Sequence, residues 1–107
     1  MANTFKNAGV AITDSATVIY TAPASTTGVI HAIYISNIHA SSDGTLDIYV
    51  TDTSSGDDFY IAKNLSVLNG SVAIFEKPLN LEATDVLKAQ ASANSVLQAF
   101  ASVLEIV

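Results

Sequence analysis

The stretch VLKAQASANSVLQAFASVLEIV, residues 86–107, decides the fold class of this chain. Its first seven residues alternate, with Leu87, Ala89 and Ala91 on one side and mostly polar side chains between them. This two-residue period is that of a half-buried β-strand. Residues 93–95 are a short polar break of the kind that turns a hairpin. The pattern therefore predicts two antiparallel strands joined by a hairpin.

The second half of the stretch is apolar on both sides, because two apolar rows oppose each other along it. A strand of this kind lies either at the centre of a sandwich or under another subunit. The two rows are Val96, Phe100, Leu104 and Ile106 against Leu97, Ala99, Ala101 and Val103.

A helix is the alternative for the same residues. Thr84 is a residue type that caps helices, and apolar side chains between Leu87 and Leu104 also recur at helical spacing. The rest of the chain is rich in alternating β-branched and aromatic residues, which favour strands. We therefore expect strands over residues 86–107.

The remainder of the chain adds further short strands separated by turns. Residues 28–39 form the longest candidate, and alternation places Val29, His31 and Ile33 on one of its faces. Asp43-Gly44 follows and predicts a tight hairpin into the next strand. About eight short antiparallel strands at even spacing predict an all-β fold, a β-sandwich or jelly roll, in a single domain over residues 1–107. Residues 1–9 are polar, and we expect a flexible N-terminal arm there.

The composition indicates that part of the apolar surface meets another protein. Half of the 107 residues are hydrophobic and 13 % are charged, against roughly 25 % charged in an average soluble protein. Such a shortage of charge favours self-association over a fully solvated surface.

The charge balance and the residue inventory exclude several classes of partner. The net charge is −6, with four Lys and no Arg, so we expect no direct contact with nucleic acid or with an anionic membrane. No apolar run approaches the length of a bilayer span, and the opening residues lack the features of a signal peptide. The absence of cysteine excludes disulfides and thiolate chemistry and fits an intracellular origin.

No motif in the sequence indicates catalysis, and we expect no enzyme activity, no cofactor and no metal. Asp52, Asp57 and Asp58 form the densest acidic group, but their spacing is not that of a calcium loop, which favours a solvated turn. His31 and His39 lie about 26 Å apart along an extended strand, so they cannot share a metal ion. A G-x-S-x-G elbow and an H-E-x-x-H motif are both missing from the sequence.

Tyrosines offer one further alternative, a glycan-binding face, because aromatic rings stack on sugar rings. Tyrosine that alternates within strands is also ordinary packing, and we prefer that interpretation. The four tyrosines are Tyr20, Tyr34, Tyr49 and Tyr60.

Three stretches together resemble small β-sandwich virion structural proteins of tailed bacteriophages. They are ANTFKNAGVAI at the start, VIYTAPASTTGVIHAIYISNI, and LNLEATDVLKAQASANSVLQAFASVLEIV at the end. The resemblance covers nearly the whole chain and includes no catalytic motif. It implies a particle component located in the virion and assembled in the host cytoplasm.

Within that family, the favoured function is a capsid decoration (cement) protein that stabilises the head by burying apolar surface between neighbouring subunits. The alternative is a neck, collar or tail fibre or adaptor component, and a glycan-binding module is less favoured. We expect a homo-oligomer, with a trimer favoured, bound to the major capsid protein or other virion proteins, and residues 1–6 docking on a neighbour. The candidate subunit-contact residues are Val29, His31, Ile33, Val96, Phe100, Leu104 and Ile106.

Overall fold

The computed structural model describes residues 3–107, and this part of the chain is built from β-strands. The helix considered for residues 86–107 is wrong, because two strands occupy this stretch. Residues 3–107 contain no helix with the length and hydrophobicity needed to cross a bilayer. The strands are β1 (Asn3–Ile12), β2 (Thr17–Thr21), β3 (Thr27–Asn37), β4 (Gly44–Asp52), β5 (Asp57–Val67), β6 (Val72–Phe75), β7 (Leu79–Leu81), β8 (Val86–Ala91) and β9 (Leu97–Ile106).

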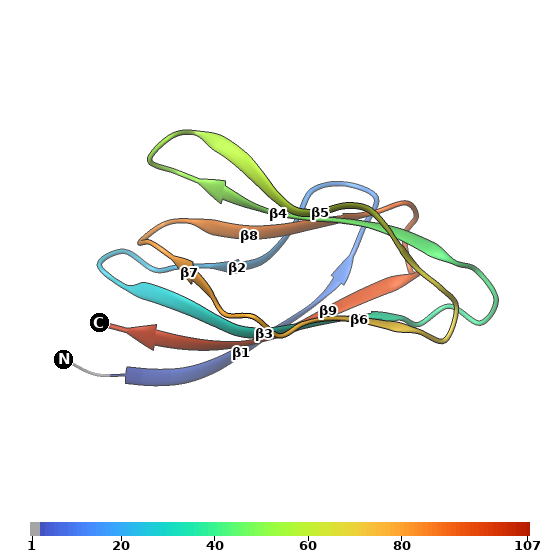
Figure 1. The fold of residues 1–107 in the computed structure, drawn as a ribbon, viewed down its shortest axis with the longest axis horizontal. Coiled ribbons are helices and arrows are strands. Elements are labelled where there is room, and N and C mark those ends of the chain that lie inside the picture. Colours follow the sequence, from blue (N-terminus) through green and yellow to red (C-terminus); the bar gives the residue numbers. More distant parts are fainter. Residues whose placement is uncertain (1–2) are drawn as a thin grey trace.

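The strands form two antiparallel sheets packed face to face, which confirms the predicted all-β sandwich. Sheet A has the order β1-β9-β3-β6, with β7 also paired to β3, and it is the lower layer in Figure 1. Sheet B has the order β2-β8-β4-β5 and is the upper layer. The buried side chains between the layers form one apolar cluster, in which Ile35, Leu46, Ile48, Leu87 and Leu97 are fully buried.

Strand pairing nests the two ends of the chain around its middle. β1 pairs with β9 over ten residues, β2 pairs with β8, β3 pairs with β6 and β7, and β4 pairs with β5. Both ends of the described chain consequently lie at the same end of sheet A (Figure 1). β9 is the central strand between β1 and β3, as its two apolar faces predicted.

The two predicted hairpins are wrong, because the strands on either side of each link belong to different sheets. β3 lies in sheet A and β4 in sheet B, and β8 and β9 are divided in the same way. Gly44 serves close packing instead of a turn, since an added Cβ would lie 3.0 Å from Cγ1 of Val96. Within the described chain, β4 and β5 are the consecutive strands that pair with each other.

A β-bulge in β3 overturns the predicted alternation of that strand. The register with β9 shifts between Ile30 and Ala32, so Ile30 and Ile33 both point into the core while His31 is exposed. The strand ends at Asn37, whose buried side-chain amide donates to the carbonyl oxygens of Ser42 and Val67 at 2.9 and 3.0 Å. The two-residue period therefore holds on either side of the bulge and is interrupted there.

The predicted N-terminal arm is part of the sheet from its third residue onward. Asn3 pairs with Ile106, and the pairing continues without a register shift to Ile12 opposite Leu97. Backbone hydrogen bonds to the far end of the chain hold this polar segment in place, and its local sequence gives no sign of that partner. Met1 and Ala2 lie outside the described residues.

Candidate interaction face

The outer surface of sheet A carries apolar side chains where a solvated sheet normally carries polar ones. We call this surface the sheet A face and define it by its six main apolar side chains. It runs across four strands, because register places Phe100 of β9 beside Tyr34 of β3, and Tyr34 beside Ile74 of β6. The six side chains are Phe5, Tyr34, Val72, Ile74, Phe100 and Leu104.

These side chains are well exposed in a single copy of the chain. Phe5 is 84 % exposed, and Tyr34, Val72, Ile74 and Phe100 are each between 40 and 50 % exposed. At roughly 200 Å² for a free aromatic side chain, these five expose on the order of 500 Å². A typical monomer has a largest apolar patch of about 300–600 Å², and such a patch is often functional.

Phe100 is the central projection of the face. Its ring lies over Gly9 of the neighbouring strand β1, where an added Cβ would lie 3.4 Å from Cδ1 of Phe100. Two hollows of about 350 and 380 Å³ flank the ring, one lined by Gly9 and Gln98 and the other by Phe5 and His31. A ring that projects between two hollows can fit into a complementary surface on another protein.

Among the described residues, the strand positions of the sheet A face carry no carboxylate and no lysine; Glu76 and Lys77, which line a hollow with Ile74, follow directly after β6 at its margin. The strands of sheet A contain two charged residues, Lys6 and Glu105, and both point to the inner side. Lys6 Nζ lies 3.3 Å from Oε1 of Glu105, and the Glu105 side chain is 8 % exposed. The charges of this sheet therefore neutralise each other away from the face.

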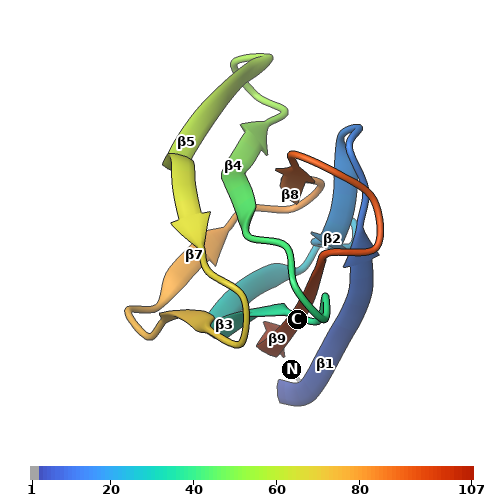
Figure 2. The same cartoon turned by 90° about the vertical axis from the view of Figure 1, so that its right-hand side faces the viewer.

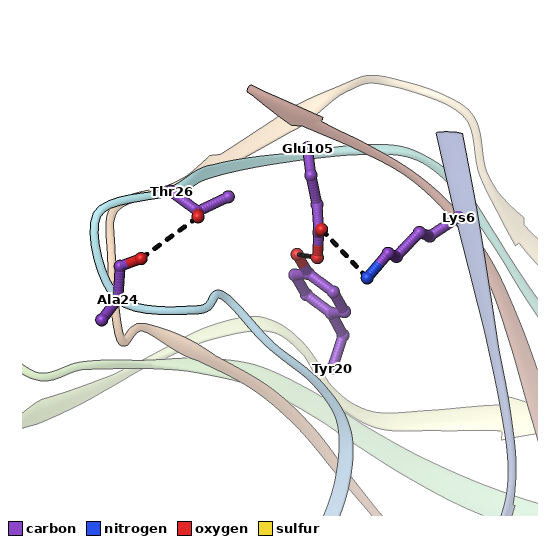
Figure 3. A network of polar contacts seen from close by, with 5 residues as sticks. All are labelled: Lys6, Tyr20, Ala24, Thr26 and Glu105. Atoms are coloured by element: carbon purple, nitrogen blue, oxygen red, sulfur yellow. Dashed lines mark hydrogen bonds and ion pairs between the residues drawn. The ribbon is translucent and has the colours of Figure 1, made fainter. Parts of the chain in front are cut away.

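Figure 3 shows the hydrogen bond that completes this inner pair and joins the two sheets. The hydroxyl of Tyr20, on β2 of sheet B, donates to Oε2 of Glu105 on β9 of sheet A at 2.6 Å. This bond lowers the pKa of Glu105 below its ordinary value, and Lys6 lowers the pKa further, against the effect of burial. Burial, followed by the bond to Glu105, raises the pKa of Tyr20 above its ordinary value. The carboxylate is thus held ionised inside the sandwich.

The outer surface of sheet B has a different chemistry. Asp47 and Lys88 lie on its strands, and Lys63 Nζ approaches Oδ2 of Asp47 at 3.8 Å. Tyr49 is buried and packs on Tyr60 with 4.8 Å between ring centroids, and Lys63 lies 4.5 Å above the ring of Tyr60, which is 47 % exposed. This surface is the solvated one, so we place the candidate site on sheet A.

The predicted subunit-contact residues divide between the face and the core. Phe100, Leu104, Ile106, Val29 and His31 belong to strands whose outward side chains form the sheet A face. Two others, Ile33 and Val96, are buried in the core cluster of the same chain, Ile33 because of the bulge in β3. A role of any of these residues in subunit contact stays a prediction, and the five residues of the outward group are the ones available for it.

Sequence reasoning missed several members of the face. Phe5 was assigned to a flexible arm, and Val72 and Ile74 were not among the candidate contact residues. Tyr34 was grouped with three other tyrosines, yet the structure separates the four. Tyr34 lies on the sheet A face, the Tyr49–Tyr60 pair lies on sheet B, and Tyr20 lies between the sheets. No single face combines them, which removes the basis of the glycan-binding alternative.

The structure gathers one acidic cluster, which differs from the predicted group. Asp52, Glu82 and Asp85 have carboxylate oxygens within 4.8 Å of one another. Asp52 accepts hydrogen bonds from the backbone and hydroxyl of Ser54, which lower its pKa, and Asp85 accepts from the backbone N–H groups of Thr53 and Glu82. The protein's own donors thus occupy the carboxylates of Asp52 and Asp85, which fix the turns at one end of the sandwich.

The two histidines are also separated, as their spacing predicted. His31 is exposed on the sheet A face, whereas His39 lies beyond the end of β3. Nδ1 of His39 accepts hydrogen bonds from the backbone of Ser41 and Ser42 at 3.1 and 2.9 Å. His39 therefore stabilises the link between the sheets.

Solved structures share this fold, although no family model and no curated protein matches the sequence. A chain from the acidic-stable capsid of Helicobacter pylori bacteriophage KHP30 matches with a TM-score of 0.58 at 12 % identity, over all of this chain and 89 % of that one. A chain from the Bacillus endospore appendages, a family of disulfide-linked pili, matches with 0.56 at 15 % identity, over 99 % of this chain and 87 % of that one.

A pentameric capsid protein from metagenomic phage sequences matches with a TM-score of 0.53 at 20 % identity. The match covers 90 % of this chain and 58 % of that chain, so this protein spans little more than half of that neighbour. At these identities the similarity shows a shared β-sandwich fold. The shared fold does not by itself assign a function to this chain.

Proposed function

We propose that this protein is a virion structural protein, of the capsid decoration (cement) type, that acts as a homo-oligomer on a phage head. The observation that carries the proposal is the uncharged, apolar sheet A face on a β-sandwich shared with phage capsid chains. A non-enzymatic, structural role fits the same observation. The trimer favoured by the sequence stays a prediction.

The strand order supports the proposal. The order β1-β9-β3-β6 over β2-β8-β4-β5, with β6 and β7 together filling one strand position, supports the jelly roll that the sequence allowed, because jelly rolls nest their strands in this way. Jelly rolls are frequent in viral capsid domains, although lectins and cupins use them too. The bacteriophage KHP30 capsid chain is nearly covered by this one, so a chain of similar length already serves in a capsid.

The energetics of the face favour a binding partner that is large and repeated. About 500 Å² of apolar surface is worth roughly 12 kcal/mol when it is removed from water. Association costs about 4–15 kcal/mol in lost freedom, so one face alone binds weakly. A shell that presents many equivalent sites to linked copies raises the apparent affinity by multivalency, which is how a cement protein holds a head together.

Two alternatives remain as outcomes of the test. A neck, collar or tail component uses the same kind of face against a different partner. The Bacillus appendage neighbour favours a filament subunit, but that family is disulfide-linked and this chain has no cysteine. We therefore place the filament alternative below both virion locations.

Copy number in purified particles tests the proposal. Quantitative mass spectrometry of particles from the source of this gene is expected to find hundreds of copies per particle, because a decoration protein binds the many repeated subunits of a head. A count of about six to fifteen indicates the neck or tail, where rings of low symmetry assemble. Absence of the protein from purified particles contradicts a virion role.

A further inference from the structure

The four sheet edges differ in how well they are protected against pairing with another strand. β2 is five residues long and has a register shift between Val18 and Tyr20. β5 has register shifts and carries Asp57, Asp58 and Lys63. The fourth edge is divided into the short strands β6 and β7, with Pro78 between them. Short length, bulges, charges and proline are the devices that prevent edge pairing.

β1 has almost none of these devices. All ten of its residues pair with β9 without a register shift, and it contains no proline. Its other side is free, because β1 is the end strand of sheet A and no described strand lies beyond it in Figures 1 and 2. An edge of this length and regularity is a template for one more strand.

The one charge on β1 does not protect this edge. An inward-pointing charge normally discourages pairing, because a second strand would have to bury it. Here Lys6 already pairs with the buried carboxylate of Glu105 at 3.3 Å. The remaining side chains of β1 are uncharged, so a second strand meets no uncompensated charge.

We infer that β1 pairs in an antiparallel manner with β1 of a second copy, which joins two sheets A into one continuous sheet. The inference deepens the proposed function, because it supplies a contact for the homo-oligomer, and it makes that oligomer a dimer in place of the trimer that the sequence favoured. Charge favours a second copy as the occupant: the protein carries a net charge of −6, so two copies approach most easily through a segment that has no acidic residue, and β1 is such a segment.

Symmetry decides what such a pair presents to its surroundings. Identical antiparallel strands are related by a twofold axis perpendicular to the sheet, so the sheet A faces of both copies lie on the same side. The pair therefore offers one uncharged surface of twice the width. Two linked faces provide the multivalent binding that a single face lacks.

The twofold axis also restricts the register, because one residue must lie opposite its own copy. An axis at Asn7, near the middle of β1, uses nearly the whole strand. It places Phe5 opposite Gly9 of the second copy, so a large side chain meets the position without one, and it places Lys6 opposite Ala8 instead of Lys6. We expect the axis at or next to Asn7.

Light scattering during size-exclusion chromatography of the purified chain tests the stoichiometry without any virus particle. A mass of two chains is expected. The variant Asn7→Lys places like charges opposite each other and is expected to weaken the pair by about tenfold or more. Ser66→Lys on the β5 edge is the matched control and should leave the pair intact. A monomer at about 100 μM, well above the dissociation constant of a typical specific pair, or a trimer, overturns the inference.

A cysteine scan tests the register. Because the chain has no native cysteine, every crosslink must come from an introduced cysteine. Single cysteines at positions 4–11 are oxidised, and crosslinked dimers are measured on gels, with Ser66→Cys as the control. Opposed Cα atoms in antiparallel strands are about 4.5–5.5 Å apart, within disulfide range. Crosslinking that peaks at one position and falls on both sides supports the pairing, whereas equal or no crosslinking along β1 overturns it. Either failure leaves the copy-number test of the virion role unaffected.

Discussion

The two outer surfaces of the sandwich are built from the same kind of strand and have opposite chemistry. The strands of sheet A carry two charged residues, Lys6 and Glu105, and both point inward. Sheet B places charges such as Asp47, Lys63 and Lys88 on its strands, with Lys63 near Asp47 at its outer surface. Sheet B also exposes apolar side chains such as Phe59 and Tyr60, but charges lie among them. The uncharged character of the sheet A face therefore belongs to one sheet and does not follow from the charge-poor composition alone.

The arrangement of charge within sheet A strengthens this conclusion. A buried carboxylate is costly unless it is paired and hydrogen-bonded, and a surface carboxylate costs almost nothing. The fold nevertheless keeps Glu105 inside, held by Tyr20 and Lys6, and leaves the outer surface of the same strand to Phe100 and Leu104. In a sheet whose only role was to face water, we would expect Phe100 and Leu104 to be buried and Glu105 to be exposed.

The largest expected effect is on binding to the phage shell that the proposed function requires. Phe100 and Tyr60 are equally exposed, at 47 %, on sheets A and B. We expect Phe100→Lys to weaken binding by about 30-fold or more, as loss of a central aromatic anchor does, and Tyr60→Lys to change it by less than about threefold. Cosedimentation with particles stripped of the protein measures both variants, and thermal melts check their folding. Equal losses in the two variants would remove the distinction between the surfaces.

The next effect concerns the bond between the sheets. Tyr20→Phe removes the hydroxyl that donates to Glu105 and leaves a buried carboxylate short of a partner. We expect a loss of about 1–3 kcal/mol in the free energy of unfolding. Tyr34→Phe, the same change on the exposed sheet A face, is the control and should cost less than about 0.5 kcal/mol. Urea unfolding at pH 7 gives both values, and similar losses would contradict the assigned role of Tyr20.

The dependence of stability on pH follows from the same bond. Because the pKa of Glu105 is lowered in the folded state, its stabilisation is complete above the ordinary value of 4.5 and is lost as pH falls through the lowered value. Because the pKa of Tyr20 is raised, its contribution is complete below 10 and is lost as pH rises further. Urea midpoints at pH 7, 5 and 3 should fall less steeply in Glu105→Gln than in the wild type.

Asp52→Asn is the control for the loss of stability at acidic pH. The pKa of Asp52 is also lowered, by hydrogen bonds from Ser54, but the group lies at the end of β4 beside an exposed turn. Its variant should retain most of the loss of stability between pH 5 and 3. If Glu105→Gln lost as much stability between pH 7 and 3 as the wild type, the bond between Tyr20 and Glu105 would not control stability at acidic pH.

The smallest effect is expected for the ion pair of sheet B. Lys63 and Asp47 are 3.8 Å apart at the solvated surface, so Lys63→Ala should reduce the free energy of unfolding by about 0–1 kcal/mol. Added salt at about 0.5 M should diminish this difference by screening. Thermal or urea unfolding at two salt concentrations measures it. A loss larger than that of Tyr20→Phe would reverse the expected ranking of the two sheets.

Local alternation in the sequence predicted the strands but not their partners. Leu87, Ala89 and Ala91 face the core as expected, and β9 buries Leu97 and Val103. The predicted hairpins failed because a polar break looks the same whether the chain turns back beside itself or crosses to the other sheet. The arm prediction failed because the partner of β1 lies at the far end of the chain.

The interaction face was predictable only in part, for the same reason. The two-sided apolar pattern indicated Phe100, Leu104 and Ile106, since β9 is central and its outer row is apolar. Phe5 and Ile74 joined the face through sheet pairing, which no local pattern records. The bulge in β3 moved Ile33 into the core, and a single inserted residue of this kind leaves no clear trace in a hydrophobic pattern.

Composition and local pattern establish that this protein is made of short amphipathic strands and that it has little charge with which to cover them. Both properties are local or additive, so composition and a two-residue period suffice to find them. The folded structure alone shows which side of each sheet meets water, that half-exposed Lys6 pairs with buried Glu105, and that β1 is left as a regular open edge. These are consequences of pairing between residues far apart in the chain, and hydrogen bonding across a sheet, not the character of any one segment, selects those pairs.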